Sequence, residues 1–321
     1  MRAIVVTRFG GPDVLELQER ATPVPGDGEL LVDVEAAGVN YRDVYEREGT
    51  GGGQPPLIAG IEGAGMVSAI GPAVTAFAAG DRVAWAAAQG SYAEQLLVPA
   101  GKAVPIPPGV SAELAASAIL QGMTAHYLAT TTYPVAAGDT VIVHAAAGGV
   151  GQLLTQIVKL RGGRVIATTS GGEKARLARE AGADEVIGYD GFAGRARDLT
   201  GGRGVAAVFD GIGRTTFDEG LAALRPRGSM VLIGSASGPA PAIDPRRLVS
   251  GSLFLTRPTI RDYTATREEL LERAGQVFGW IADGSLKVRI GARYQLEDAR
   301  RAHEDLASRS SAGKLVLVLR P

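Results

Sequence analysis

Cysteine is absent from the 321 residues of the chain. This absence excludes disulfides, thiolate nucleophiles, cysteine-ligated iron–sulfur clusters and every zinc site that uses cysteine. Histidine is scarce, and His126, His144 and His303 do not stand at the i, i+4 spacing that turns two imidazoles toward one metal ion. We therefore expect structural histidines and no metal site.

Neither sign of charge dominates, because 33 Lys and Arg residues stand against 34 Asp and Glu residues. The charges alternate along the chain and form no basic stripe, so nucleic acid is not an expected partner. No uninterrupted apolar stretch reaches the ~18 residues of a membrane span. The N-terminal residues lack the apolar segment and cleavage site of a signal peptide. We expect a soluble, cytoplasmic protein with no membrane partner.

Glycine is abundant, with 45 residues, about twice the usual share of ~7%. Up to about residue 100, short apolar strands alternate with Pro/Gly turns, which is typical of a barrel-like β domain. From Thr140 onward strands and helices alternate, and the apolar strands suit a parallel sheet that is buried on both faces. The sequence therefore predicts an α/β protein: a doubly wound domain at 123–257, and a second domain built from 1–122 and 258–321.

The strongest motif is the glycine-rich turn at 144–151 (HAAAGGVG), which follows a strand and opens a helix. Such a turn brings backbone N–H groups and a helix N-terminus close to a dinucleotide pyrophosphate. Ala146 occupies the position of the first fingerprint glycine, Gly148 permits close approach, and Gly151 permits packing of the helix on the strand. The predicted contacts are Ala147, Gly148, Gly149, Val150 and Gly151. The alternative is a turn that only packs a helix closely.

The end of the next strand indicates which dinucleotide binds. An NAD-binding unit carries an acid there for the ribose 2′-hydroxyl, whereas this chain has Thr169, Ser170 and two glycines. Lys174 follows and is a suitable cation for a 2′-phosphate, so Ser170 and Lys174 predict NADPH as the cofactor. A solvated lysine at a helix start is the alternative for Lys174.

With these residues in hand, the chain resembles the zinc-independent medium-chain dehydrogenases/reductases of the quinone oxidoreductase (zeta-crystallin-like) group. The resemblance covers nearly the whole chain and rests on segments 23–45, 60–67 (GIEGAGMV), 79–85, 144–151, 210–213 (DGIG), 255–270 and 301–317. It implies a GroES-like domain beside a Rossmann domain, with the active site in the cleft between them. Zinc-dependent relatives carry a Cys at the position of Asn40 and a His at that of Ile61, so metal-free transfer is implied.

The resemblance also assigns site residues. It places Asn40 and Tyr45 beside the nicotinamide and the substrate, where they would orient the ring amide or donate to a substrate oxygen. Further cofactor contacts implied by the resemblance are Thr124, Tyr189, Gly234, Ser235, Thr256 and Lys314. A surface lysine is the alternative for Lys314, and a structural role in a turn or a cap is favoured for Asp43. No buried acid is evident as a proton donor. Where relatives carry an aromatic residue this chain has Gly51, which predicts a more open pocket and a mobile 49–53 loop.

These expectations converge on an NADPH-dependent reductase of quinones. The first alternative is an enoyl or alkenal double-bond reductase with Tyr45 as proton donor. The second is a non-catalytic, crystallin-like NADPH-binding protein. The resemblance further implies a homodimer joined at the edge of the Rossmann sheet, for which the apolar strand at 253–255 is the candidate.

Overall fold

The computed structural model describes residues 1–308 and 311–319 and forms two compact units. Unit 1 is Met1–Gln121 with Thr266–Pro321, and unit 2 is Gly122–Ala265. Positions 309–310, within the segment 301–317, and 320–321, at the end of the predicted second domain, lie outside the described residues. Residues 258–265 belong to unit 2, where Tyr263 stacks on Tyr127 with ring centroids 4.3 Å apart.

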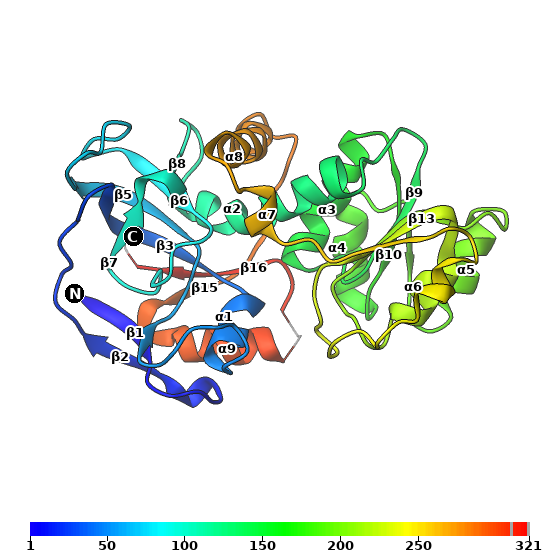
Figure 1. Ribbon diagram of the computed structural model, residues 1–321, viewed down its shortest axis with the longest axis horizontal. Helices are drawn as coiled ribbons and strands as arrows, with labels where there is room; N and C mark the ends of the chain where they lie inside the picture. Colours follow the sequence, from blue (N-terminus) through cyan, green and yellow to red (C-terminus); the bar gives the residue numbers. More distant parts are fainter. Residues whose placement is uncertain (309–310, 320–321) are drawn as a thin grey trace. The chain divides into compact units, whose positions relative to one another are not determined.

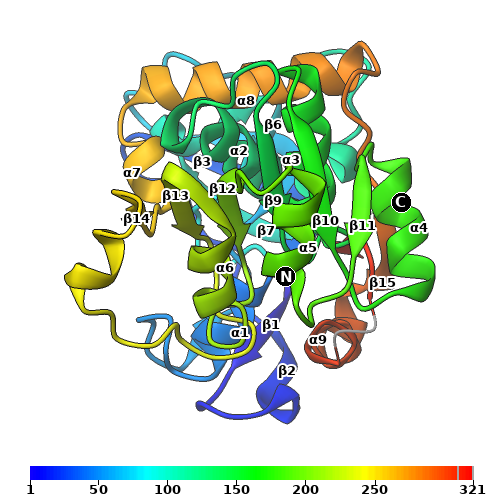
Figure 2. The same cartoon turned by 90° about the vertical axis from the view of Figure 1, so that its right-hand side faces the viewer.

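Unit 2 contains a parallel sheet of the doubly wound kind. Within residues 122–265, all of them described, six strands pair in the order β11-β10-β9-β12-β13-β14. Figure 2 shows β12, β9 and β10 side by side. The strands are β9 (Thr140–Val143), β10 (Arg164–Thr168), β11 (Glu185–Ile187), β12 (Val205–Asp210), β13 (Leu224–Leu232) and β14 (Phe254–Thr256). The order reverses between β9 and β12, the place where such sheets bind ligands. The predicted parallel, doubly wound sheet is confirmed.

The strands are connected by the helices α3 (Gly149–Leu160), α4 (Gly172–Glu180), α5 (Phe192–Leu199) and α6 (Phe217–Ala223). Helix α7 (Ile260–Tyr263) follows β14. Phe192 of α5 and Phe217 of α6 pack on a sheet face that presents Ile142, Ile166 and Val208, all buried. The alternate residues Val141, Val143 and Val165, which face the other side of the sheet, are buried too, so both faces are apolar.

Unit 1 is built mainly from antiparallel strands, coloured from blue to cyan and again red in Figure 1. Among its described residues, β15-β16-β3-β5-β6-β8 follow one another in a sheet in which β7 also pairs with β3, and β2-β1-β4 form a second sheet. The strands are β1 (Arg2–Val6), β2 (Leu15–Glu19), β3 (Glu29–Val39), β4 (Leu57–Ile58), β5 (Gly63–Ile70), β6 (Arg82–Trp85), β7 (Gln95–Pro99), β8 (Val104–Pro105), β15 (Ile290–Gln295) and β16 (Lys314–Val318). Because β16 pairs with β3, the chain's last strand completes the first domain's sheet.

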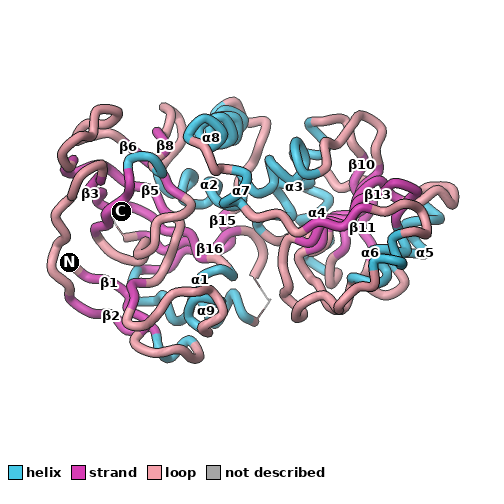
Figure 3. The backbone as a smooth tube through the Cα atoms, in the orientation of Figure 1, coloured by secondary structure: helices cyan, strands magenta, loops and turns pink. Residues whose placement is uncertain are grey.

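Unit 1 also contains the helices α1 (Tyr41–Arg47), α8 (Arg267–Ala282) and α9 (Ala299–Ala307). Helix α2 (Ala112–Tyr127) begins in unit 1 and runs without interruption through Gly122, where the sequence predicted a boundary. Figure 3 shows α2 and α8 among the helical segments. Ser111 caps the start of α2 by accepting the Leu114 N–H at 3.2 Å. In the described part of the chain, no helix is both long and apolar enough to cross a membrane.

Candidate functional site

The turn between β9 and α3 exposes backbone N–H groups. Gly148 caps α3, and its N–H closes a turn onto the Ala145 carbonyl at 2.8 Å. Gly149, Val150 and Gly151 open the helix, so their N–H groups have no acceptor within it. The side chain of Gln152 donates to the Ala147 carbonyl at 2.7 Å and holds the turn in place. This arrangement suits an anionic group such as a pyrophosphate.

Gly151 fits this turn because it has no side chain. A Cβ at this position would lie 2.4 Å from the Ala145 carbonyl oxygen and 2.7 Å from the Ala146 Cα. Both atoms belong to the backbone of the turn and have no side-chain torsion by which to move away. The helix thus approaches the turn at a distance that only glycine allows.

Ala145 and Tyr189 fix the strand side of the turn. Ala145 adopts a positive φ of 49°, which is uncommon for a residue with a side chain. Its N–H donates to the Tyr189 hydroxyl at 3.2 Å. Burial raises the pKa of Tyr189. Tyr189, one of the cofactor contacts implied by the resemblance, therefore supports the turn between β9 and α3.

The other residues expected at the cofactor follow the carboxyl ends of neighbouring strands in the same sheet. Ser170 and Lys174 come after β10, Gly234 and Ser235 come after β13, and Thr256 ends β14. Because the strands are parallel, these positions lie at the same end of the sheet, the carboxyl end, as the turn between β9 and α3. No acid stands between the end of β10 and Gly172, which starts α4. Thr124 lies elsewhere, buried on α2.

Asp210 organises the loop after β12. Its buried carboxylate accepts the backbone N–H groups of Ile212 at 2.7 Å and Gly213 at 3.0 Å, and the Thr216 hydroxyl at 2.8 Å. This bonding explains the DGIG segment, because the aspartate closes the loop beside the point where the strand order reverses.

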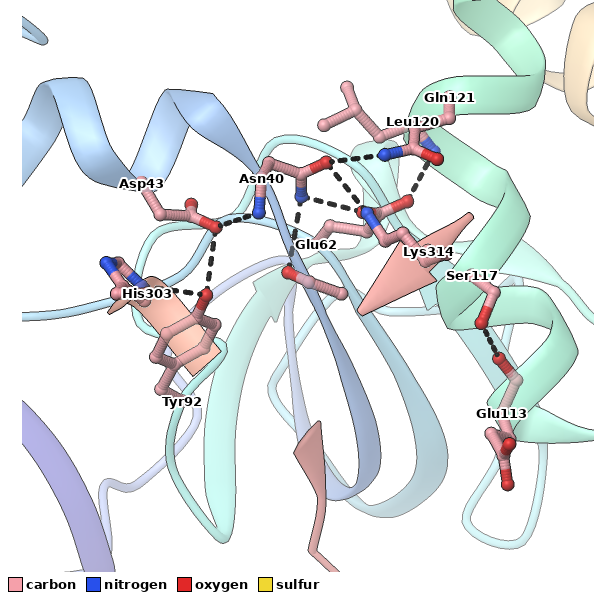
Figure 4. Close-up of polar contacts among 11 residues, drawn as sticks. Asn40, Asp43, Glu62, Tyr92, Glu113, Ser117, Leu120, Gln121, His303 and Lys314 are labelled. Carbon is pink, nitrogen blue, oxygen red and sulfur yellow. Dashed lines mark hydrogen bonds and ion pairs between the residues drawn. The ribbon is translucent and has the colours of Figure 1, made fainter. Parts of the chain in front are cut away.

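In unit 1, Asn40 is the centre of a buried hydrogen-bond network (Figure 4). Its Nδ2 donates to Glu62 Oε2 at 2.8 Å and to the Gly38 carbonyl at 3.2 Å. Its Oδ1 accepts from Lys314 Nζ at 2.7 Å and from Gln121 Nε2 at 3.4 Å. A carboxamide has two N–H groups and two lone pairs. All four are used inside unit 1, so none remains for a substrate oxygen in this arrangement.

Lys314 is not a surface residue, and that alternative for it was wrong. Its side chain is 1% exposed and lies 2.5 Å from Glu62, whose side chain is 0% exposed. Lysine is almost never fully buried without a partner, and here the counter-charge comes from the GIEGAG segment. Gly38 makes room for the pair, since a Cβ there would lie 2.3 Å from Glu62 Oε2 and 2.7 Å from Lys314 Cε.

Asp43 lies beside this network and has the capping role expected of it. Its Oδ2 accepts the Asn40 N–H at 2.8 Å at the start of α1, and the Tyr92 hydroxyl at 3.0 Å. Burial raises the pKa of Asp43 to about 7. Asp43 is therefore a buried acid, although none was evident from the residue pattern, and its Oδ2 accepts from these two donors.

All three histidines are buried. His144 Nδ1 lies 2.6 Å from the Thr168 hydroxyl, and burial lowers the pKa of His144 to about 4. His303 Nε2 lies 3.3 Å from the Tyr92 hydroxyl, and burial, followed by the nearby Arg47 charge, lowers the pKa of His303 to about 3. Neutral imidazoles held in this way are structural.

Tyr45 differs from Asn40 because its hydroxyl has no hydrogen-bond partner among the residues that the structure describes. The side chain is half-buried on α1, with its ring 6.4 Å from that of Tyr41. Of the two residues expected at the reacting groups, Tyr45 is the one with a free donor.

The loop that contains Gly51 folds back on α1. The Gly51 carbonyl accepts from Arg42 at 2.9 Å, and the Gly53 N–H donates to Glu46 at 3.0 Å. A Cβ at Gly51 would lie 2.7 Å from the Glu46 Cα. An aromatic residue therefore does not fit this conformation of the loop. Its mobility stays a prediction.

Glu62 and Gln121 were missed as members of this network. Glu62 stands among small residues in the segment 60–67 (GIEGAGMV), and Gln121 falls in an apolar helix beside the predicted boundary. Glu62 is a carboxylate among glycines and alanines, and Lys314 is a lysine at the start of an apolar strand. Each is a charge in surroundings expected to be buried, so the sequence could have suggested that the two form a pair.

The chain has close relatives among known proteins. Residues 26–108 match the alcohol dehydrogenase GroES-like domain, and residues 149–276 match the zinc-binding dehydrogenase family. A quinone oxidoreductase of Pseudomonas aeruginosa is 41% identical over 99% of both chains. A 2-haloacrylate reductase of Burkholderia is 37% identical over 98% of both chains. The solved structure of mycobacterial Rv1454c complexed with NADPH is 50% identical, covers 99% of this chain and 100% of its own, and superposes with a TM-score of 0.97.

The name of the second match refers to zinc. The resemblance places a Cys and a His of the zinc-dependent relatives at the positions that Asn40 and Ile61 occupy here. Among residues 1–308 and 311–319, no group of three or more His, Asp or Glu side chains is placed to hold a metal ion.

Proposed function

Because this chain belongs to the quinone oxidoreductase group of the medium-chain dehydrogenases/reductases, we propose that it reduces quinones with NADPH. The family, the α/β fold and the GroES-like domain predicted from the sequence are thereby confirmed. The observation that carries the proposal is the N–H-lined turn at Gly148–Gly151 together with the acid-free end of β10. When bound, NADPH supplies the hydride.

In this proposal the residues of the chain bind and orient the cofactor and the substrate. Ala147, Gly148, Gly149, Val150 and Gly151 hold the pyrophosphate, and Ser170 and Lys174 hold the 2′-phosphate. Thr124, Gly234, Ser235 and Thr256 line the remaining cofactor, while Tyr189 supports the turn. Tyr45 donates to the oxygen on which negative charge develops, and a solvent proton completes the reduction. Asn40 and Lys314 stabilise the surroundings of Tyr45 through their buried hydrogen-bond network in unit 1. No metal takes part.

The test is oxidation of NADPH, followed by its absorbance, across a panel of quinones and enones. Turnover with quinones after divalent ions have been removed is the expected result. A protein that binds NADPH but oxidises none of it across the panel would instead be the non-catalytic alternative. Loss of turnover on removal of divalent ions would contradict the metal-free reaction.

A second candidate is reduction of an activated carbon–carbon double bond, which the similarity to a 2-haloacrylate reductase favours. Tyr45→Phe separates the two candidates because it removes only the hydroxyl. With quinones we expect kcat/KM to fall about three- to tenfold, because the hydrogen bond from the hydroxyl to the developing anion is lost while solvent still supplies the proton. A loss with enones that is more than about tenfold larger than the loss with quinones would favour the double-bond reductase with Tyr45 as its acid.

Lys174→Ala tests the choice of cofactor. Hydrogen bonds to charged groups contribute about 1.5 to 3 kcal/mol, so we expect the kcat/KM ratio of NADPH to NADH to fall about tenfold to hundredfold. An equal fall for both cofactors would show that Lys174 does not bind the phosphate. Lys102→Ala is a control, because the Lys102 amine donates to the Ala87 carbonyl in unit 1.

We also propose that the chain forms a homodimer through β14. This strand ends the order of the sheet, and Phe254 is 60% exposed although it is a large apolar residue. Phe254→Glu is expected to convert a dimer to a monomer in light scattering, since it places a charge on the pairing edge. Val24→Glu, at an 84% exposed position of unit 1, is the matched control. A monomeric wild-type protein would refute the proposal.

A further inference from the structure

The orientation of the Asn40 carboxamide is fixed by charged neighbours. Its nitrogen must face the Glu62 carboxylate and its oxygen must face the Lys314 ammonium group, because the reverse orientation would oppose like groups. The positions of the Asn40 side-chain nitrogen and oxygen are therefore determined by Glu62 and Lys314, which form the buried ion pair. Asn40 in turn presents an acceptor, Oδ1, to Gln121.

This acceptor orients the side chain of Gln121. Its Nε2 faces Asn40 Oδ1 at 3.4 Å, so its Oε1 must point away from Asn40 (Figure 4). The Gln121 Oε1 atom is buried and has no hydrogen-bond partner among the described residues. A buried acceptor without a partner is uncommon in proteins and indicates a ligand or an ordered water.

The backbone at Gln121 is anchored as well. Glu62 Oε1 accepts the N–H of the preceding residue, Leu120, at 2.7 Å. The same carboxylate that binds Lys314 and Asn40 thus also holds the helix α2 next to Gln121. Such an anchored acceptor is preorganised for a donor from outside the protein.

The chemistry of an acceptor restricts what it binds. A quinone carbonyl is itself an acceptor and cannot pair with Oε1. The nicotinamide end of NADPH carries an N–H donor, its carboxamide, and Gln121 precedes Thr124 on α2 by three residues, about one helical turn. The donor and the acceptor match if the cofactor binds as proposed above.

We propose that Gln121 is a cofactor-binding residue that accepts a hydrogen bond from the carboxamide N–H of the nicotinamide. Asn40 orients the Gln121 amide, and the Lys314–Glu62 pair fixes Asn40. This inference rests on the proposed use of NADPH. In this proposal the buried Lys314–Glu62 pair serves to hold the Gln121 amide oxygen in position for the nicotinamide end of the cofactor.

The experiment compares two ligands by calorimetry. NADP⁺ carries the carboxamide, whereas its 3-acetylpyridine analogue carries a methyl ketone without the N–H. Gln121→Leu is expected to weaken NADP⁺ binding about three- to tenfold and to change binding of the analogue less than twofold. Gln89→Leu is the matched control, because Gln89 is an exposed glutamine whose side chain donates to a backbone carbonyl at Ile58.

The measured quantity is the ratio of the affinities for NADP⁺ and for the analogue. General damage to the fold weakens binding of both ligands equally and therefore leaves this ratio unchanged. Equal weakening of both ligands by Gln121→Leu, or no weakening of either, overturns the inference. A wild-type protein that binds neither ligand overturns the proposed use of NADPH as well, which distinguishes the two failures.

Discussion

Replacing Gly151 with alanine is expected to weaken NADPH binding by more than about 100-fold. The new Cβ would lie 2.4 Å from the Ala145 carbonyl oxygen, so the turn or the start of α3 must move. That movement misdirects the N–H groups of Gly149 and Val150, and one or two bonds to a charged group contribute about 1.5 to 3 kcal/mol each. Calorimetric titration with NADPH measures the loss.

Gly194→Ala is the control for this substitution. Gly194 lies on α5 of the same unit, and no heavy atom lies within 4 Å of a Cβ placed there. Wild-type affinity is expected for this variant. If Gly151→Ala also retained affinity within a factor of three, the pyrophosphate would not bind at this turn.

Replacing Lys314 with methionine is expected to lower the free energy of unfolding by about 3 to 5 kcal/mol. Removal of one partner leaves Glu62 charged at a 0% exposed site, with only the Asn40 amide and the Leu120 N–H to stabilise it. The loss exceeds that expected for a surface lysine, which is usually within 0.5 kcal/mol. Urea-induced unfolding measures the difference.

The double variant Glu62→Gln/Lys314→Met separates the charge from the packing. It removes both charges at similar volume, so it is expected to be more stable than Lys314→Met by at least about 1 kcal/mol. A double variant no better than the single one would mean that lost packing, and not an unpaired carboxylate, causes the destabilisation.

The sequence predicted the parts of the fold that local pattern determines. The alternation of apolar strands and helices after Thr140 located the doubly wound sheet, and the small residues at 144–151 located the turn before α3. In the parallel sheet, strand ends alone bring Ser170, Gly234 and Thr256 to one edge. These predictions needed only spacing and the topology of the sheet.

The network around Asn40 could not be predicted in this way. Glu62 and Lys314 are 252 positions apart and meet only because β16 pairs with β3. Spacing along the chain carries no information about such a pair. Similarly, Gln121 gains its unpaired acceptor from the orientation of Asn40, which depends on that pair. The short helix α1 was missed because its seven residues give too little periodicity to be recognised.

The pairing of β16 with β3 has a consequence for the order in which a ribosome-bound chain folds. Unit 2 is continuous in sequence and is complete once Ala265 has emerged. Unit 1 still lacks β16 then, and Glu62 has no ammonium partner until Lys314 has emerged as well. We expect the inserted unit to fold before the unit whose two segments surround it in the sequence.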